Sequence, residues 1–173
     1  MYPYNRNTQL YGTHARAKET PTPADQTALL ASDKRLEELL HLARQEAHET
    51  ARKFETLLGS TELAEAEAIL KAMYLDGLKH LRLLQDVGFT IFGTTGEITE
   101  MTPAETTTTD TRALLEELLL AEMDDINFYR DLLFAMPEKD LWNALFEIIT
   151  DKQNHTAALN HLYAKYYTKT SGN

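Results

Sequence analysis

The sequence predicts an all-α protein: an antiparallel four-helix bundle made of two helical hairpins joined by a long crossover. Four segments repeat apolar residues at spacings of three and four, which is the period of one helix face. The connections between these segments are short, long and short, and a connection of about 20 residues can run the length of a bundle. With 173 residues, 43% of them hydrophobic, the chain is expected to form one domain.

The first two predicted helices form one hairpin. Gly59 stops the first helix, and Ser60 is the expected N-cap of the second, whose end is marked by Gly88 and Gly93. The inner face of the first helix comprises Leu36, Leu39, Leu40, Ala43, Ala47, Thr50, Ala51, Phe54, Leu57 and Leu58. The inner face of the second comprises Ala66, Ile69, Leu70, Met73, Gly77, His80 and Leu84.

The other two predicted helices form the second hairpin. Asp110 is expected to cap the third helix, and Pro137 suits the first turn of the fourth. The inner face of the third helix comprises Leu115, Leu118, Leu119, Glu122, Ile126, Tyr129 and Leu133. That of the fourth comprises Leu141, Leu145, Ile148, Lys152, His155, Leu159 and Tyr163. Lys152 and His155 therefore interrupt an apolar stripe about one turn apart, and this interruption is the main functional signal in the sequence.

We expect the bundle to span residues 24–168, with a flexible N-terminal tail at 1–23 and a short C-terminal tail at 169–173. The N-terminal tail is polar, with three prolines and three tyrosines, which favours an extended chain. Its tyrosines could instead dock onto the domain or onto a partner. Three apolar residues are expected to pack the crossover against the bundle: Phe89, Ile91 and Phe92.

The composition bears on partners and location. The formal net charge is -10, from 27 acidic and 17 basic residues without a basic patch, so we expect no nucleic-acid partner. The absence of cysteine excludes disulfides and thiolate metal sites. The N-terminus lacks the apolar stretch of a secretory signal, and no window approaches about 18 consecutive apolar residues. We therefore expect a cytoplasmic protein with no membrane partner.

The two halves of the chain resemble each other. A shift of 75 residues superposes Asp76 on Asp151 and His80 on His155, together with several leucines. Leucine matches between helices are common by chance, but the paired Asp-x-x-x-His pattern is more specific. It places the same polar residues on the second and fourth helices, as a pseudo-twofold bundle requires.

On these residues the chain resembles ferritin-like proteins of the rubrerythrin type, over residues 33–166. The segments that carry the resemblance are AEMDDINFYRDLL in the third helix and IITDKQNHTAALNHLY in the fourth. In that family the first and third helices each give one glutamate and the other two each give Glu-x-x-His, and together they hold two iron or manganese ions. The resemblance implies iron oxidation, peroxide reduction or other dioxygen chemistry, with His80, Glu122 and His155 as retained ligand positions.

The chain departs from the family pattern at three of the four carboxylates. Lys152 replaces the glutamate of the fourth helix, Gly77 replaces that of the second, and Ala47 stands at the equivalent position of the first. Glu46, next to Ala47, would serve as a ligand only if its helix rotates. Because an ammonium group repels a nearby divalent cation, the resemblance implies a degenerate metal site.

We interpret Lys152 as replacing the charge of the lost metal ions, with Glu122 as its counter-ion, because a buried charge is tolerable only when it is paired. Asp76 and Asp151 are expected to orient the histidines in carboxylate–histidine pairs, as is typical around metal sites. Tyr129 is expected to pack in the core with one hydrogen bond from its hydroxyl group.

Three alternatives stay open. Lys152 would snorkel to the surface if the fourth helix were rotated. His80 and His155 would be ordinary hydrogen-bonded core histidines, or they would join Glu122 in holding a single iron(II) or zinc ion.

The favoured function is a non-enzymatic structural or interaction module without a cofactor. The alternative is an iron- or manganese-dependent oxidoreductase that uses a reduced ligand set. Small bundles of this type often pair through exposed apolar faces, so a homodimer is compatible with either function. The sequence identifies no particular protein partner.

Overall fold

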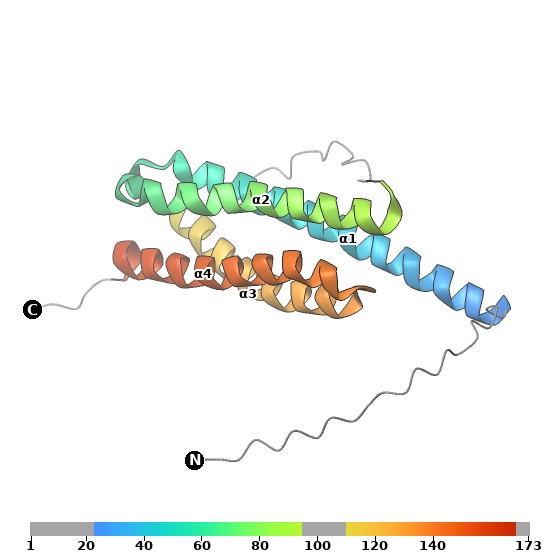
Figure 1. Ribbon diagram of the computed structural model, residues 1–173. Coiled ribbons are helices and arrows are strands. Elements are labelled where there is room, and N and C mark those ends of the chain that lie inside the picture. The colour runs from blue at the N-terminus through green and yellow to red at the C-terminus, as the bar shows by residue number, and fades with distance from the viewer. Residues whose placement is uncertain (1–22, 95–109, 169–173) are drawn as a thin grey trace, which may run out of the picture.

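The computed structural model describes residues 23–94 and 110–168, with the backbone alone for residues 23–31. Four long helices dominate it: α1 (Pro23–Leu58), α2 (Glu67–Phe92), α3 (Thr111–Ala135) and α4 (Trp142–Tyr167). Two short 3-10 helices precede α2 and α4: η1 (Thr61–Ala66) and η2 (Lys139–Leu141). These ranges contain no strand, so the predicted all-α class is confirmed (Figure 1).

The helices are arranged as two antiparallel hairpins, α1 with α2 and α3 with α4 (Figure 1). Between the hairpins, α1 borders α3 and α2 borders α4. Because α2 and α3 run in the same direction, the chain between Phe92 and Thr111 connects opposite ends of the bundle. At 36 residues α1 is longer than the 26-residue α2, and its first turns project beyond the other three helices (Figure 1).

The helix ends follow the predicted residues in two places. The carboxylate of Asp110 accepts hydrogen bonds from the backbone N–H groups of Arg112 and Ala113, which confirms the predicted N-cap of α3. Gly93 follows the last residue of α2 with a φ of 70°, the left-handed conformation that glycine adopts most readily. Both ends are therefore set by local chemistry that is visible in the sequence.

Other local predictions were wrong. Residues 86–92 belong to α2 and not to the crossover, so Gly88 is internal to the helix and Phe89 is 58% exposed. Pro137 lies before η2, and α4 begins only at Trp142. Ser60 precedes η1 without capping it, because its hydroxyl group contacts that of Thr111 instead.

The core consists of two apolar clusters separated by a polar layer. The first cluster lies toward the α3–α4 turn and comprises Leu36, Leu40, Ala43, Ala47, Leu84, Val87, Tyr129, Leu132, Leu133, Met136, Leu145, Ile148 and Ile149. The second lies toward the α1–α2 turn and comprises Phe54, Leu57, Leu63, Ala66, Leu70, Met73, Leu114, Leu115, Leu118, Leu159 and Leu162. Along every helix, buried polar residues fall between the two: Thr50, His80, Glu122, Lys152 and His155. Ile69, expected on an inner face, is 40% exposed.

Gly77 allows α1 and α2 to approach closely beside the polar layer. A Cβ atom added at Gly77 would lie 3.0 Å from the Cβ and 3.3 Å from the Cα of Ala51. Ala47 and Ala51 on the facing side of α1 are both almost fully buried. The hairpin is therefore packed too tightly at this level to hold a long side chain at position 77 without moving the helices apart.

Candidate functional site

Lys152 lies at the centre of the polar layer. Its side chain is 1% exposed, so the alternative in which it snorkels to the surface is wrong. The ammonium nitrogen lies 2.9 Å from Oδ2 of Asp125, 3.0 Å from Oε1 of Glu46 and 3.5 Å from Oε2 of Glu122. The expected contact with Glu122 is thus present but is the longest of the three, and the ammonium group donates its hydrogen bonds to the other two carboxyl groups.

Glu46 reaches the cluster from α1, where its Oε1 accepts a hydrogen bond from the Lys152 ammonium group at 3.0 Å. Its Oε1 also accepts a hydrogen bond from the hydroxyl group of Thr50, one turn further along the helix, at 2.8 Å. Its Oε2 accepts from the hydroxyl group of Tyr129 at 2.7 Å, and that hydroxyl group also lies 3.1 Å from the carbonyl oxygen of Ala43. Tyr129 is fully buried, as expected, but its hydroxyl group has two hydrogen-bond partners and not one.

The cluster gathers more carboxyl groups than its single ammonium group can neutralise. Burial by itself would lower the pKa of Lys152, but the charges on Glu46, Glu122 and Asp125 outweigh it and raise that pKa. Burial and the neighbouring Glu46 raise the pKa of Asp125 to about 8. Burial opposes ionisation of Glu46 as well, yet Lys152 holds the pKa of Glu46 below its usual value.

The opposite pKa shifts of Glu46 and Asp125 indicate which of the two carboxyl groups holds a proton more readily. Burial and Glu46 favour the protonated form of Asp125, whereas Lys152 favours the ionised form of Glu46. The arrangement is a buried ion network in which one ammonium group faces three carboxyl groups.

The two histidines form reciprocal pairs across the α2–α4 interface. Nε2 of His80 donates to Oδ2 of Asp151 at 3.0 Å, and Nε2 of His155 lies 3.2 Å from Oδ2 of Asp76. Each aspartate therefore orients the histidine of the other helix. Burial lowers the pKa of His80, so its ring is neutral at pH 7.

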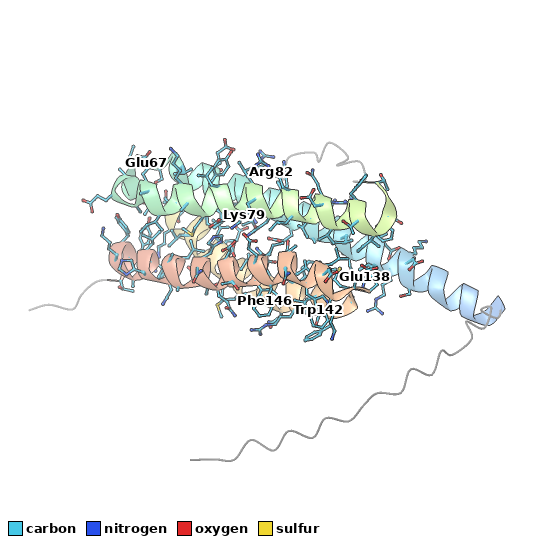
Figure 2. The ribbon with its side chains drawn as sticks, in the orientation of Figure 1. Glu67, Lys79, Arg82, Glu138, Trp142 and Phe146 are labelled. Atoms are coloured by element: carbon cyan, nitrogen blue, oxygen red, sulfur yellow. The ribbon has the colours of Figure 1, made fainter. Side chains whose placement is uncertain are left out.

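Lys79 closes this interface on the solvent side. Its ammonium nitrogen lies 2.7 Å from Asp151, 3.0 Å from Asp76 and 3.1 Å from Glu147, and Figure 2 shows it between α2 and α4. Its side chain is 37% exposed, in contrast to that of Lys152. Partial burial would lower the pKa of Lys79, but hydrogen bonds to Asp151 and its other two partners raise it.

The retained ligand positions do not converge as a metal site. Nδ1 of His155 and Oε2 of Glu122 lie 3.5 Å apart, and both are buried without a hydrogen-bond partner. His80 is directed to Asp151 instead, with its ring centre 6.0 Å from that of His155. Across residues 23–94 and 110–168, no group of three or more histidine, aspartate or glutamate side chains is arranged to hold a metal ion. The donors present therefore do not fit the di-metal centre that the resemblance implies.

Sequence reasoning missed two of these residues. Asp125 follows Glu122 by three positions, so both lie on one face of α3, and this spacing was the available signal. Lys79 directly precedes His80, but nothing in the sequence distinguishes it from an ordinary surface lysine. Its role depends on α4, which supplies two of its three carboxylates.

Comparison with models of known protein families, with curated proteins and with solved structures finds no match to this chain. The resemblance to rubrerythrin-type proteins therefore rests on the sequence motifs alone. In the described part of the chain, no helix combines the length and apolar character needed to cross a membrane.

Proposed function

We propose that this chain is a ferritin-like, rubrerythrin-type domain in which a lysine-centred ion network has replaced the di-metal centre. In this proposal the domain is a structural or interaction module and not an oxidoreductase. The observation that carries the proposal is the position of the Lys152 ammonium group, in contact with carboxyl groups from α1 and α3 in the middle of the bundle.

The arrangement of the helices supports the ferritin-like part of the proposal. Two antiparallel hairpins linked by a crossover between opposite ends of the bundle are the topology that ferritin-like proteins share. The polar layer also lies midway between two apolar clusters, where metal sites of such bundles are built from facing helices.

The steric environment of Gly77 supports the loss of the metal centre. A glutamate there would have to displace Ala51, because even a Cβ atom would approach its Cβ to 3.0 Å. Ala47 supplies no donor on the facing helix. Restoring the four carboxylates of the family would therefore require separating α1 from α2, in addition to replacing Lys152.

The ion network itself suggests a structural role. A buried charge without a partner is strongly destabilising, so only one alignment of the four helices satisfies Lys152. Sliding α4 by one turn, about 5.4 Å, would remove the ammonium group from Glu46 and Asp125 and place it against apolar side chains. The layer would thus fix the register of the hairpins, as single buried polar residues do in coiled coils.

The test is metal analysis of the protein purified without chelators, followed by titration with Mn²⁺ or Fe²⁺. We expect no stoichiometric metal and no rise in melting temperature on titration. In Lys152→Glu, which adds a carboxylate beside Glu46, Glu122 and Asp125, we expect a melting temperature that rises with Mn²⁺. Lys152→Gln is the control, because it removes the ammonium group without adding an ionised ligand.

Roughly two iron or manganese ions in the wild-type protein would overturn the proposal and favour the oxidoreductase alternative. A single bound ion whose loss follows substitution of His80, Glu122 or His155 would instead favour the mononuclear site. An identical response of the glutamate and glutamine variants to Mn²⁺ would contradict the idea that Lys152 occupies a cation position.

A further inference from the structure

An exposed aromatic surface lies at the start of α4, away from the polar layer. Phe146 is 65% exposed, and Trp142 is half-buried one turn before it, so the two side chains share one face of the helix. Figure 2 shows both residues on the side of α4 that faces away from α2. Together, the exposed ring of Phe146 and the exposed part of Trp142 form a small apolar surface that another segment can cover.

Trp142 has a second unusual feature. Its indole Nε1–H group is removed from solvent yet has no hydrogen-bond partner among the described residues. An orphaned buried donor of this kind is destabilising, because it has lost its hydrogen bond to water. The Lys139 ammonium group lies 5.9 Å from the ring centre and cannot accept a hydrogen bond. Because the bundle already covers this N–H group, a docked segment would reach only the exposed part of the indole ring.

The composition of residues 1–22 is basic and includes aromatic residues. They contain three basic residues and one acidic residue, whereas the whole chain has a net charge of -10. The exposed residues near Trp142 include Glu138 and Asp140. A basic segment with three tyrosines and a leucine therefore complements the acidic, aromatic surface in both charge and polarity.

The chain is also long enough to reach the surface. Residues 1–22 precede Pro23, the first residue of α1, and the projecting part of α1 lies at the end of the bundle where α4 begins (Figure 1). From Pro23 to Leu36, the first buried residue among the side chains of α1 that the structure describes, the helix rises by about 20 Å. Twenty-two extended residues span up to about 70 Å, which is more than three times the rise from Pro23 to Leu36, and Leu36 belongs to the cluster against which Trp142 packs.

We propose that residues 1–22 of this chain dock in cis on the aromatic surface formed by Trp142 and Phe146. The tyrosines would pack against the two rings, and Arg6, Arg16 and Lys18 would face the acidic residues around them. The proposal does not depend on whether the polar layer binds a metal.

The sequence is well suited to a contact measurement. Trp142 is the only tryptophan and the chain has no cysteine, so an Asn5→Cys variant carries one bimane label whose emission falls when tryptophan touches it. We expect weaker bimane emission in this full-length variant than in the same variant with Trp142→Phe. Because the contact is intramolecular, the ratio of the bimane emission with tryptophan to that with phenylalanine at position 142 should not change as the protein is diluted.

Two substitutions and a salt titration test the surface itself. Phe146→Ser should restore the bimane emission, whereas Leu75→Ser, which changes a comparably exposed apolar residue on α2, should leave it low. Raising the salt to about 1 M shortens the screening length to about 3 Å and should restore part of the emission. Both changes lie on exposed side chains, and helix content measured by circular dichroism verifies the fold.

Three results would overturn the proposal. Equal bimane emission with tryptophan and phenylalanine at position 142 would show that residues 1–22 do not reach this surface. Emission that falls with increasing protein concentration would assign the surface to a second copy of the chain. Equal effects of Phe146→Ser and Leu75→Ser would show that the aromatic surface is not the docking site.

Discussion

Replacing Lys152 by methionine tests the ion network most directly. Methionine has a similar length and no charge, so the variant leaves Glu46, Glu122 and Asp125 without their cation. The contact with Glu46 at 3.0 Å is worth about 5 kcal/mol of Coulomb energy at an effective dielectric constant of about 20, before the cost of desolvation is subtracted. Removing one partner of a buried ion pair typically costs about 3–5 kcal/mol. We expect a loss of that size in the free energy of unfolding at pH 8, measured by urea denaturation.

The loss should be smaller at pH 5, because the carboxyl groups left without a partner can then take up protons. Lys79→Met is the matched control: Lys79 also contacts three carboxylates at 2.7–3.1 Å, but its side chain is 37% exposed. Exposed ion pairs contribute about 0–1 kcal/mol, so we expect the control to fall in that range. A cost below about 1 kcal/mol for Lys152→Met at pH 8 would refute the reasoning, since it would equal that of a surface pair.

Three further changes test other parts of the structure. Gly77→Ala should lower the free energy of unfolding by about 1–3 kcal/mol through the clash with Ala51, although alanine is the better helix former, and thermal melts would detect it. Asp125→Asn should remove the contribution of this carboxyl group to the pH dependence of the free energy of unfolding. A carboxyl group with a folded-state pKa of about 8 stabilises the fold below about pH 4 and loses that contribution as the pH rises to 8, so the wild-type minus variant difference should fall by up to about 1.4 kcal/mol per pH unit. A flat difference would show that Asp125 titrates normally. Asp110→Ala should cost about 1 kcal/mol by removing the N-cap of α3, and a change within error would argue that the cap is dispensable.

The inner faces of the helices were readable from the sequence because each helix buries one stripe of residues at a fixed period. That period placed Glu122, Lys152 and His155 in the core, and all three are buried. Asp110 was also readable, because an N-cap depends on the residues next to it. Gly88 and Pro137 misled the prediction of helix ends, because tertiary packing continues α2 through the glycine and delays α4 beyond the proline.

The partners of the buried charges were decided by the tertiary structure. The sequence by itself determined that a lysine must enter the core and need compensation there, since burial follows from periodicity and an unpaired charge is costly. It did not determine that Glu46 and Asp125 lie closer to Lys152 than Glu122 does, or that each aspartate pairs with the histidine of the other helix. Those choices depend on the rotation and spacing of α1 and α2 against α3 and α4. Such distances are set by packing across the hairpins, which no local pattern of residues encodes.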